Sequence, residues 1–516
     1  MSSITNPRRP RTPSRQTQRS SSPHQRRTQR HAAQRQRQRQ LRKAHAARQK
    51  ARAARRQLRR IHEQAPPQAR SLLDTLAGAF TRPTFLRFFV LTLAAILTLG
   101  NRTICNLLRT LGALAPGAPS SYHRVFSHRC WSLWGLARRL IGWLLDHLVP
   151  DGTIFLAGDD TVDEHCGDKV FGKGCHRDAV RSSHNYTAYR WGHKWVVLAV
   201  LVRFPFCQRQ WALPVLVALY HGIKDDEEHE RRHKTPQRLL RQLSCLLLRW
   251  FRQRRFVLTG DGNFATHELA GFAAKRPGGR LALVSKFYAD ANLVEPPPPP
   301  PPPLPSGKKR PGRPRIKGKK LPSPEKVVAK AKRTYLNVAW YGGGRRNVAV
   351  VSGVAHWYKA GDGLVEVRWV FVHDRTGTHR DEYFMSTNVE MTPQEIIETY
   401  VARWNEETTF EEMRSYLGLE TTRGWKQTTV LRVGPCLFGL YTVVACLYSQ
   451  LPQRWQRERA TEWKGKEVVT YSDAITAVRR WLWVEWVFAT PGFKPAFAKL
   501  SRPFRKLLLH ALAPAA

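Results

Sequence analysis

A chain of 516 residues can bury a substantial core and form more than one domain. Its formal net charge is +48, from 86 Lys and Arg against 38 Asp and Glu, and such a field predicts a polyanionic partner, above all nucleic acid. The eight cysteines contain no CxxC pair, which argues against a zinc ribbon or a disulfide framework and for reduced thiols.

Two further features need a structural or functional interpretation. His165-Cys166 and Cys175-His176 could hold a metal ion, but their spacing matches no common zinc pattern, and an ordinary loop is favoured. The apolar run 88–101 is too short to span a membrane. The run 433–453 is long enough, but its glycines and proline and the charge of the chain favour a buried core helix.

The N-terminal third divides into a basic arm and a helical region. Residues 1–62 hold 20 Arg and Lys and no Asp or Glu, which predicts a disordered basic arm over 1–68, partly helical when it lies on a phosphate backbone. Helical patterns follow over 71–79, 85–99, 103–111 and 132–148. They predict a helical DNA-binding domain over 70–150, of helix-turn-helix type, with a plain helical bundle as the alternative.

The middle of the chain predicts an α/β domain. Strand patterns at 153–158, 194–204 and 211–220 precede a helix at 235–253, a strand at 255–260 and a helix at 264–275. This order indicates a mixed sheet with flanking helices, whose first part covers 151–277 and whose second part covers 393–455. A helical region over 456–516 completes the chain.

Between the two parts of this core, residues 278–392 predict a β-rich insertion. It is interrupted over 296–333 by a linker that begins with eight consecutive prolines, a stiff polyproline spacer. The linker continues into Gly312-Arg313-Pro314-Arg315 flanked by lysines, which resembles an AT-hook that lies in an A·T minor groove through Arg313 and Arg315. A generic basic linker is the alternative.

The segment from residue 400 to 414 carries the most informative pattern. Tyr400, Arg403, Glu407 and Arg414 stand at offsets of 0, 3, 7 and 14, within roughly 60° of one another on an α-helix. Cations suit a phosphate backbone, and a carboxylate among them makes sense if it holds a metal. Ordinary i,i+4 ion pairing on a solvated helix is the competing interpretation.

Aspartates at the ends of two predicted strands support the functional interpretation. Asp159 and Asp160 end the strand at 153–158, and Asp261 ends the strand at 255–260. Groups beyond the carboxyl ends of strands gather in one crevice of an open α/β sheet, so these aspartates can converge with Glu407. Three carboxylates suit Mg²⁺, and a pair of such ions can serve an in-line phosphoryl displacement.

Together, Asp159-x-Thr161, Asp261-Gly-Asn-Phe264 and Tyr400-x₂-Arg403-x₃-Glu407-x₆-Arg414 resemble insertion-sequence transposases of the DDE superfamily, in the branch with a Tyr-Arg-Glu-Lys signature. The resemblance covers roughly residues 120–450. It implies an RNase H-like fold in which Asp159, Asp261 and Glu407 bind two Mg²⁺ ions, for which Mn²⁺ can substitute.

The resemblance also implies that Tyr400, Arg403 and Arg414 contact DNA near the element end. Arg414 stands where the family has Lys, which keeps the charge but changes the geometry. Asp160 remains an alternative to Asp159, and Glu411 an alternative to Glu407.

The expected function is that of a DNA transposase that binds the terminal inverted repeats of its element, cuts the DNA and joins the freed 3′-hydroxyl to a target. Such an enzyme is expected to act as a homodimer on paired double-stranded ends, in the bacterial cytoplasm with the nucleoid. The alternatives are a catalytically decayed or repurposed architectural DNA-binding protein and, less favoured, a nuclease acting on RNA–DNA hybrids.

Overall fold

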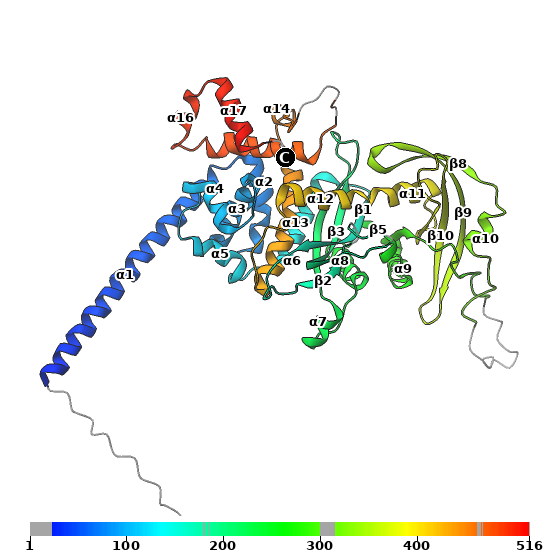
Figure 1. The fold of residues 1–516 in the computed structure, drawn as a ribbon, viewed down its shortest axis with the longest axis horizontal. Helices are drawn as coiled ribbons and strands as arrows, with labels where there is room; N and C mark the ends of the chain where they lie inside the picture. Colours follow the sequence, from blue (N-terminus) through cyan, green and yellow to red (C-terminus); the bar gives the residue numbers. More distant parts are fainter. Residues whose placement is uncertain are drawn as a thin grey trace, which may run out of the picture. The chain divides into compact units, whose positions relative to one another are not determined.

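The computed structural model describes residues 23–178, 181–183, 185–299, 315–461, 466 and 468–514 (Figure 1). The chain forms two compact units, Met1–Gln57 and Leu58–Ala516. Helix α1 (Pro23–Glu63) accounts for the described part of the first unit and supplies the first residues of the second. Residues 23–63, expected as part of a disordered arm, are therefore helical, because Arg, Gln, Ala and Lys are strong helix formers.

The second unit begins with a helical region, as the periodicity predicts. Its helices are α2 (Pro67–Asp74), α3 (Arg82–Leu97), α4 (Ile104–Leu111), α5 (Pro119–Ser127) and α6 (Leu133–Leu148). The side chains of Thr103 and Ser132 accept hydrogen bonds from backbone N–H groups in the first turns of α4 and α6 and so fix where these helices begin. Helix α3 is apolar on nearly all sides because it lies at the centre of this region.

A mixed sheet of eleven strands forms the centre of the unit. Its order is β2-β3-β1-β5-β6-β11-β10-β9-β7, with β4 beside β3 and β8 beside β9. The strands are β1 (Thr153–Glu164), β2 (Gly174–Arg177), β3 (Tyr189–Val202), β4 (Trp211–Tyr220), β5 (Arg255–Gly260), β6 (Leu281–Lys286), β7 (Leu293–Val294), β8 (Thr334–Ala339), β9 (Arg345–Lys359), β10 (Gly363–Asp374) and β11 (Glu382–Ser386).

The expected RNase H-like core corresponds to β4-β3-β1-β5-β6, in which β1, β5 and β6 are parallel and β3 and β4 are antiparallel to their neighbours. The expected boundary of the insertion at 278 differs from the structure, because β6 is a strand of this core. The strands that follow extend the same sheet, since β11 pairs with the free edge of β6 and satisfies its backbone groups.

Strand β1 is longer than expected. It runs to Glu164, so Asp159 and Asp160 lie inside it rather than at its end. Its pairing with β3 continues to Glu164, and this partner keeps the polar residues after Gly158 extended. Alternation along β1 then places Asp159 and Asp160 on opposite faces of the sheet.

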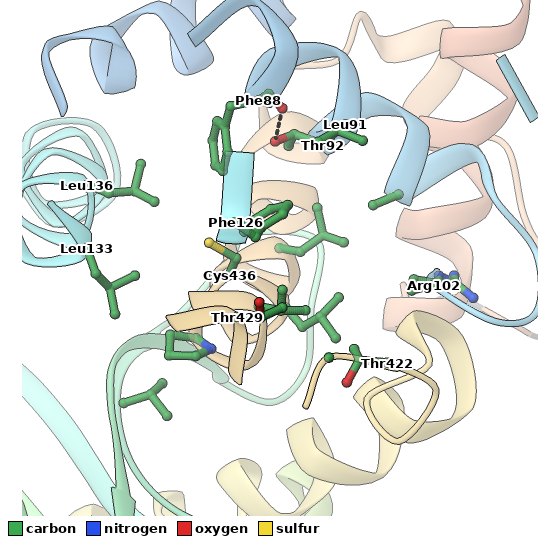
Figure 2. A pocket seen from close by; sticks show the side chains of 18 of the residues that line it. Phe88, Leu91, Thr92, Arg102, Phe126, Leu133, Leu136, Thr422, Thr429 and Cys436 are labelled. Atoms are coloured by element: carbon green, nitrogen blue, oxygen red, sulfur yellow. Dashed lines mark hydrogen bonds between the residues drawn. The ribbon is translucent and has the colours of Figure 1, made fainter. Parts of the chain in front are cut away.

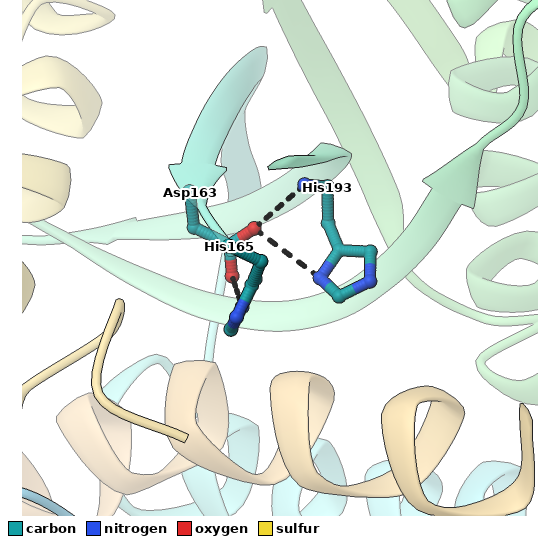
Figure 3. A group of neighbouring side chains, drawn as sticks. All are labelled: Asp163, His165 and His193. Atoms are coloured by element: carbon teal, nitrogen blue, oxygen red, sulfur yellow. Dashed lines mark hydrogen bonds and ion pairs between the residues drawn. The ribbon is translucent and has the colours of Figure 1, made fainter. Parts of the chain in front are cut away.

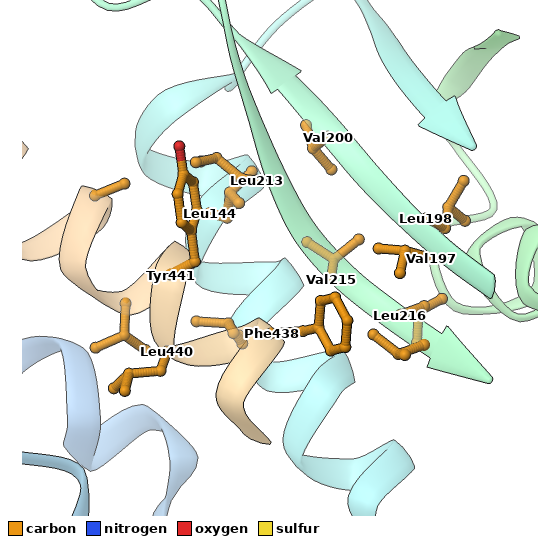
Figure 4. Close-up of a cluster of buried hydrophobic side chains, with 14 of the residues drawn as sticks. Leu144, Val197, Leu198, Val200, Leu213, Val215, Leu216, Phe438, Leu440 and Tyr441 are labelled. Atoms are coloured by element: carbon orange, nitrogen blue, oxygen red, sulfur yellow. The ribbon is translucent and has the colours of Figure 1, made fainter. Parts of the chain in front are cut away.

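Helices cover both faces of the core. Helices α12 (Asn405–Leu417) and α13 (Gln427–Ser449) pack on one face against β1 and β4, and α8 (Pro236–Trp250) packs on β3 and β4. The side chain of Leu240 on α8 lies against Gly158, on the opposite face of β1 from Asp159. Figure 4 shows Phe438 and Tyr441 of α13 among valines and leucines of β3 and β4.

Helix α13 is also the one helix in the described ranges that is long and apolar enough to cross a membrane. Twelve of its side chains are buried in the protein, from Val430 to Tyr448, and the ring of Tyr441 stacks on Tyr471 at 4.0 Å. Helix α13 is therefore apolar because it is a core helix of this unit, as expected for residues 433–453.

The remaining helices complete the chain. They are α7 (Ile223–Glu228), α9 (His267–Ala274), α10 (Pro324–Val328), α11 (Pro393–Ala402), α14 (Gln453–Gln456), α15 (Tyr471–Leu482), α16 (Lys494–Lys499) and α17 (Arg502–Leu512). Helix α15 packs against α13 and is buried over most of its length.

The close approach of α13 to β3 depends on Gly434. A Cβ atom there would lie 2.5 Å from Trp195, whereas a Cβ at Gly439 would make an ordinary 3.7 Å contact with Leu140.

We therefore expect Gly434→Ala to lower the free energy of unfolding by about 1–3 kcal/mol through overpacking. Gly439→Ala should be neutral or stabilising because Ala favours helix by about 0.8–1 kcal/mol. Urea unfolding of both variants checks this, and an equal response at both positions would contradict it.

Candidate active site

Neighbouring parallel strands bring Asp159 and Asp261 together. Gly158 of β1 is in register with Gly260 of β5, and each aspartate is the next residue along its strand. The Asp261 carboxylate accepts hydrogen bonds from the backbone N–H groups of Asn263 and Phe264 at 2.9 and 3.3 Å. These bonds fix the carboxylate at the turn that follows β5.

A single guanidinium joins Asp159 to Glu407. Arg403 donates from one Nη atom to Asp159 Oδ2 and from the other to Glu407 Oε1, both at 2.8 Å. The Arg403 side chain is 10% exposed and that of Asp159 is 14% exposed, whereas the Glu407 side chain is 48% exposed. A cation thus holds two carboxylates from distant parts of the chain beside each other.

The helix expected through residues 400–414 is two helices. Helix α11 ends at Ala402 and α12 begins at Asn405. Across the junction the backbone N–H groups of Arg403 and Trp404 donate to residues three positions earlier, as in a 3₁₀ turn. The tighter turn rotates the residues that follow, so the expected single face does not continue unchanged from Tyr400 to Arg414.

This rotation places Glu406 in the interior. Its side chain is fully buried, and neither carboxyl oxygen has a hydrogen-bond partner among the described residues. Burial raises the pKa of Glu406 well above its usual range, and the charges of Asp159, Glu407 and Asp261 act in the same direction. The sequence analysis missed Glu406, although the doubled Glu406-Glu407 at the start of a helix was a visible signal.

Neighbouring carboxylates also affect the charge of Asp159. Burial raises the pKa of Asp159 to about 7, Arg403 opposes the rise, and the charges of Asp261 and Asp160 add to it. Asp160 lies on the opposite face, where its carboxylate pairs with Lys194 at 3.0 Å. Of the two alternatives in β1, Asp159 is therefore the one on the face with Arg403 and Glu407.

The cationic and aromatic residues of the signature are engaged within the protein. Tyr400 is 2% exposed and its ring stacks on Phe384 at 4.3 Å, so the expected DNA contact at Tyr400 does not fit this arrangement. A ring in the apolar face of α11 is held by core packing, which the spacing alone could not reveal. Arg414 donates to Thr161 Oγ1 at 2.5 Å and to the Val162 carbonyl at 3.0 Å, and so ties α12 to β1.

The other expected site residues lie apart from this cluster. Glu411 is exposed on α12, and no contact between it and the two aspartates is recorded among the described residues. Arg315, within the linker, is exposed, and Arg313 lies outside the described residues.

A separate apolar cavity of about 430 Å³ lies between the helical region and α13 (Figure 2). Its lining includes Phe88, Leu91, Phe126 and Leu136 and has no carboxylate. This cavity does not include Asp159, Asp261 or Glu406, whose carboxyl oxygens are ligands of the kind that a hard divalent cation such as Mg²⁺ prefers.

Comparison with known proteins gives a family for this chain. A family model described as DDE superfamily endonuclease matches residues 75–347, which is more than half of the 516 residues. The matched region contains Asp159 and Asp261 and ends before Arg403 and Glu407. No curated protein matches the chain.

The bridge made by Arg403 generates a prediction about stability. Arg403→Gln leaves Asp159 without its cation in a buried position, which should cost about 3–5 kcal/mol in a chelator. Millimolar Mg²⁺ should recover part of this loss, because a divalent cation can replace the missing positive charge. Urea unfolding with EDTA and with Mg²⁺ measures both effects. The exposed change Arg249→Gln on α8 is the control, and an Arg403 variant as stable as this control would contradict the prediction.

Proposed function

The chain belongs to the DDE superfamily of endonucleases, and from that membership we propose that it is a DNA transposase. It would bind the terminal inverted repeats of its element, cut the DNA there and transfer the freed 3′-hydroxyl to a target. The observation that carries this proposal is that Arg403 joins Asp159 to Glu407, while Asp261 on the neighbouring strand end lies close enough to Asp159 to act on its charge.

The donor set proposed for two Mg²⁺ ions is Asp159, Asp261 and Glu407, with Glu406 as a fourth carboxyl. Bound divalent ions supply Lewis acidity to the attacking and leaving oxygens of an in-line displacement. Glu406 supports the proposal because a buried carboxyl without a partner costs free energy unless a cation or proton compensates it. Mn²⁺ is expected to substitute, since it favours the same oxygen ligands.

Two successive reactions would use this site. Water first displaces the 3′ oxygen of a phosphodiester, which leaves a 3′-hydroxyl and a 5′-phosphate. That 3′-hydroxyl then attacks a target phosphodiester, forms the new bond and releases another 3′-hydroxyl. Arg403 holds Asp159 and Glu407 in place, and Arg414 fixes α12 on β1, so both keep the carboxylates positioned for each reaction.

The substrate assignment rests on charge. A net charge of +48 favours long phosphate backbones, and α1 presents exposed arginines along most of its length. Because two element ends must be paired, the enzyme would act as a homodimer. It would act on DNA of the nucleoid in the bacterial cytoplasm.

The first test is cleavage of labelled duplex DNA that carries the element's own ends, in Mg²⁺, by the wild type and three isosteric variants. We expect Glu407→Gln and Glu406→Gln to reduce nicking at the element boundary by at least about 100-fold, more than the loss of an outer-shell partner. Glu411→Gln, an exposed change on the same helix, should cleave like the wild type.

The outcomes separate the alternatives. Tight DNA binding without cleavage by the wild type would favour the architectural protein. Cleavage that requires an RNA–DNA hybrid would favour the hybrid nuclease. Activity that survives in the Glu407 variant but not in the Glu406 variant would move the third ligand to Glu406.

A second test addresses the basic arm. Residues 1–57 carry 18 Arg and Lys and no Asp or Glu, so their deletion should weaken nonspecific duplex binding and reduce the slope of log affinity against log salt. Each phosphate contact that is lost should lower the slope by about 0.9. Fluorescence anisotropy between 50 and 300 mM salt, roughly the range in which counterion release is measured, gives the slope. An unchanged slope would show that the arm does not contact DNA.

A further inference from the structure

A buried cluster of two histidines and one aspartate lies at the far end of β1. Asp163, His165 and His193 are 2%, 7% and 2% exposed, and one ligand atom from each lies within 4.8 Å of the others (Figure 3). Asp163 is four residues beyond Asp159 on the same face of β1, roughly 13 Å along the strand at 3.3 Å per residue. The cluster is therefore separate from the carboxylates around Arg403.

Strand pairing assembles this cluster. Asp163 of β1 is directly opposite His193 of β3, and the backbone N–H of His193 donates to Asp163 Oδ1 at 3.1 Å. One residue past the end of β1, the His165 N–H donates to the Trp191 carbonyl at 3.1 Å, so the chain continues alongside β3 in the same register. The two imidazole rings lie 4.5 Å apart, on either side of one carboxylate.

The hydrogen-bond partners of His193 indicate that a cation is needed between its ring and Asp163. Its Nε2 lies 2.9 Å from the Phe171 carbonyl, which can only accept, so Nε2 carries a proton. In a neutral ring, Nδ1 then carries no proton and can only accept a hydrogen bond. It lies 3.5 Å from Asp163 Oδ1, and an ionised carboxylate oxygen can also only accept. Two facing acceptors in a buried site require a cation between them, either a second proton or a metal ion.

The distances within the cluster fit a tetrahedral metal. Bonds of about 2.0–2.2 Å to nitrogen and oxygen place neighbouring ligand atoms roughly 3.3–3.6 Å apart. His193 Nδ1 lies 3.5 Å from Asp163 Oδ1 and His165 Nε2 lies 3.2 Å from Asp163 Oδ2, so the two imidazoles face different oxygens of the carboxylate at separations close to these values.

We propose that Asp163, His165 and His193 bind a structural Zn²⁺ ion through Asp163 Oδ, His165 Nε2 and His193 Nδ1. Imidazole nitrogens favour zinc over the magnesium that suits an all-carboxylate site. The N–H of His193 that donates to the Phe171 carbonyl is the outer-shell bond that metal-binding histidines make. A small ligand such as water takes the fourth position.

The ion would join β1, and the residues that directly follow it, to β3. His193 of β3 also contacts the Phe171 carbonyl, and the Phe171 backbone N–H donates to the Trp425 carbonyl at 2.9 Å. Thr161, two residues before Asp163, receives Arg414 from α12. Zinc at this position would therefore stabilise the end of the strand on which α12 is anchored.

A second histidine–carboxylate group shows the contrasting case. His221, Asp225 and Asp226 also lie close together, but Arg231 pairs with both aspartates, with Nε 3.0 Å from Asp226 Oδ1. A positive charge is already present there. Among the described residues, the cluster at Asp163 is the candidate group that needs a cation and receives none from Lys or Arg in any recorded ion pair.

The test uses the tag-free, full-length protein purified without chelator. Elemental analysis should find about one equivalent of zinc per chain, and exchange for Co²⁺ should give the visible absorption of tetrahedral cobalt. Variants His193→Gln and His165→Gln should retain less than about a tenth of an equivalent. His176→Gln is the matched control, since His176 is a buried histidine on β2 that is not in the cluster and whose Nε2 has no hydrogen-bond partner among the described residues.

A thermal melt gives an independent measure. EDTA should lower the Tm of the wild type and of His176→Gln, and zinc should restore it, whereas the His193 variant should respond to neither. A folded wild type that holds no zinc after zinc addition and shows no tetrahedral cobalt spectrum would overturn the proposal. Equal zinc content in the wild type and in the His193 variant would overturn it as well.

Discussion

The ion pairs of Arg403 are the interaction on which the arrangement of this site depends. Asp159 belongs to a strand near the centre of the sheet, and Glu407 belongs to a helix nearly 250 residues later in the chain. Their like charges repel, and the guanidinium offsets that repulsion through one hydrogen bond to each carboxylate. Arg403 also lies at the turn that separates α11 from α12. The residue that neutralises the two carboxylates is therefore also at the point where the direction of α12 is set.

Strand β1 connects the parts of the molecule that carry chemistry. Its alternation places Asp159, Thr161 and Asp163 on one face, where they meet Arg403, Arg414 and His193 respectively. The opposite face carries Asp160, which Lys194 neutralises, and packs near α8. A shift of one residue in the pairing of β1 with β3 would exchange these faces and separate all three contacts.

Groups that suit different metal ions lie at different positions along β1. Asp159, just beyond the part of β1 that pairs with β5, lies with other carboxylates, which suit magnesium. Asp163, near the end of β1, lies with the imidazoles of His165 and His193, and such a group with a single carboxylate suits zinc. The mixed sheet makes this possible, because parallel β5 contributes Asp261 at one end of the β1 ladder and antiparallel β3 contributes His193 at the other.

Local patterns and chemistry in the sequence predicted the helical region, the α/β order, the buried character of residues 433–453 and the convergence of Asp159 with Asp261. Those features follow from hydrophobic periodicity and from the rule that parallel strands end at a common edge. Tertiary contacts decided the rest. Partner strands extended β1 past its aspartates and joined β11 to β6, and neither pairing can be inferred from one segment alone.

The same limit applies to individual side chains. Glu406, for which the sequence patterns made no prediction, is buried next to the 3₁₀ turn at Arg403, and packing on Phe384 buries the ring of Tyr400, although the spacing of Tyr400 with Arg403, Glu407 and Arg414 suggested an exposed face. His165 and His193 are 28 residues apart and match no metal motif, so only the register of two strands brings them to one carboxylate. The sequence by itself determined which chemistry is present, because that depends on residue type and short spacing. The tertiary structure decided which groups meet and which are buried, because those depend on contacts between distant segments.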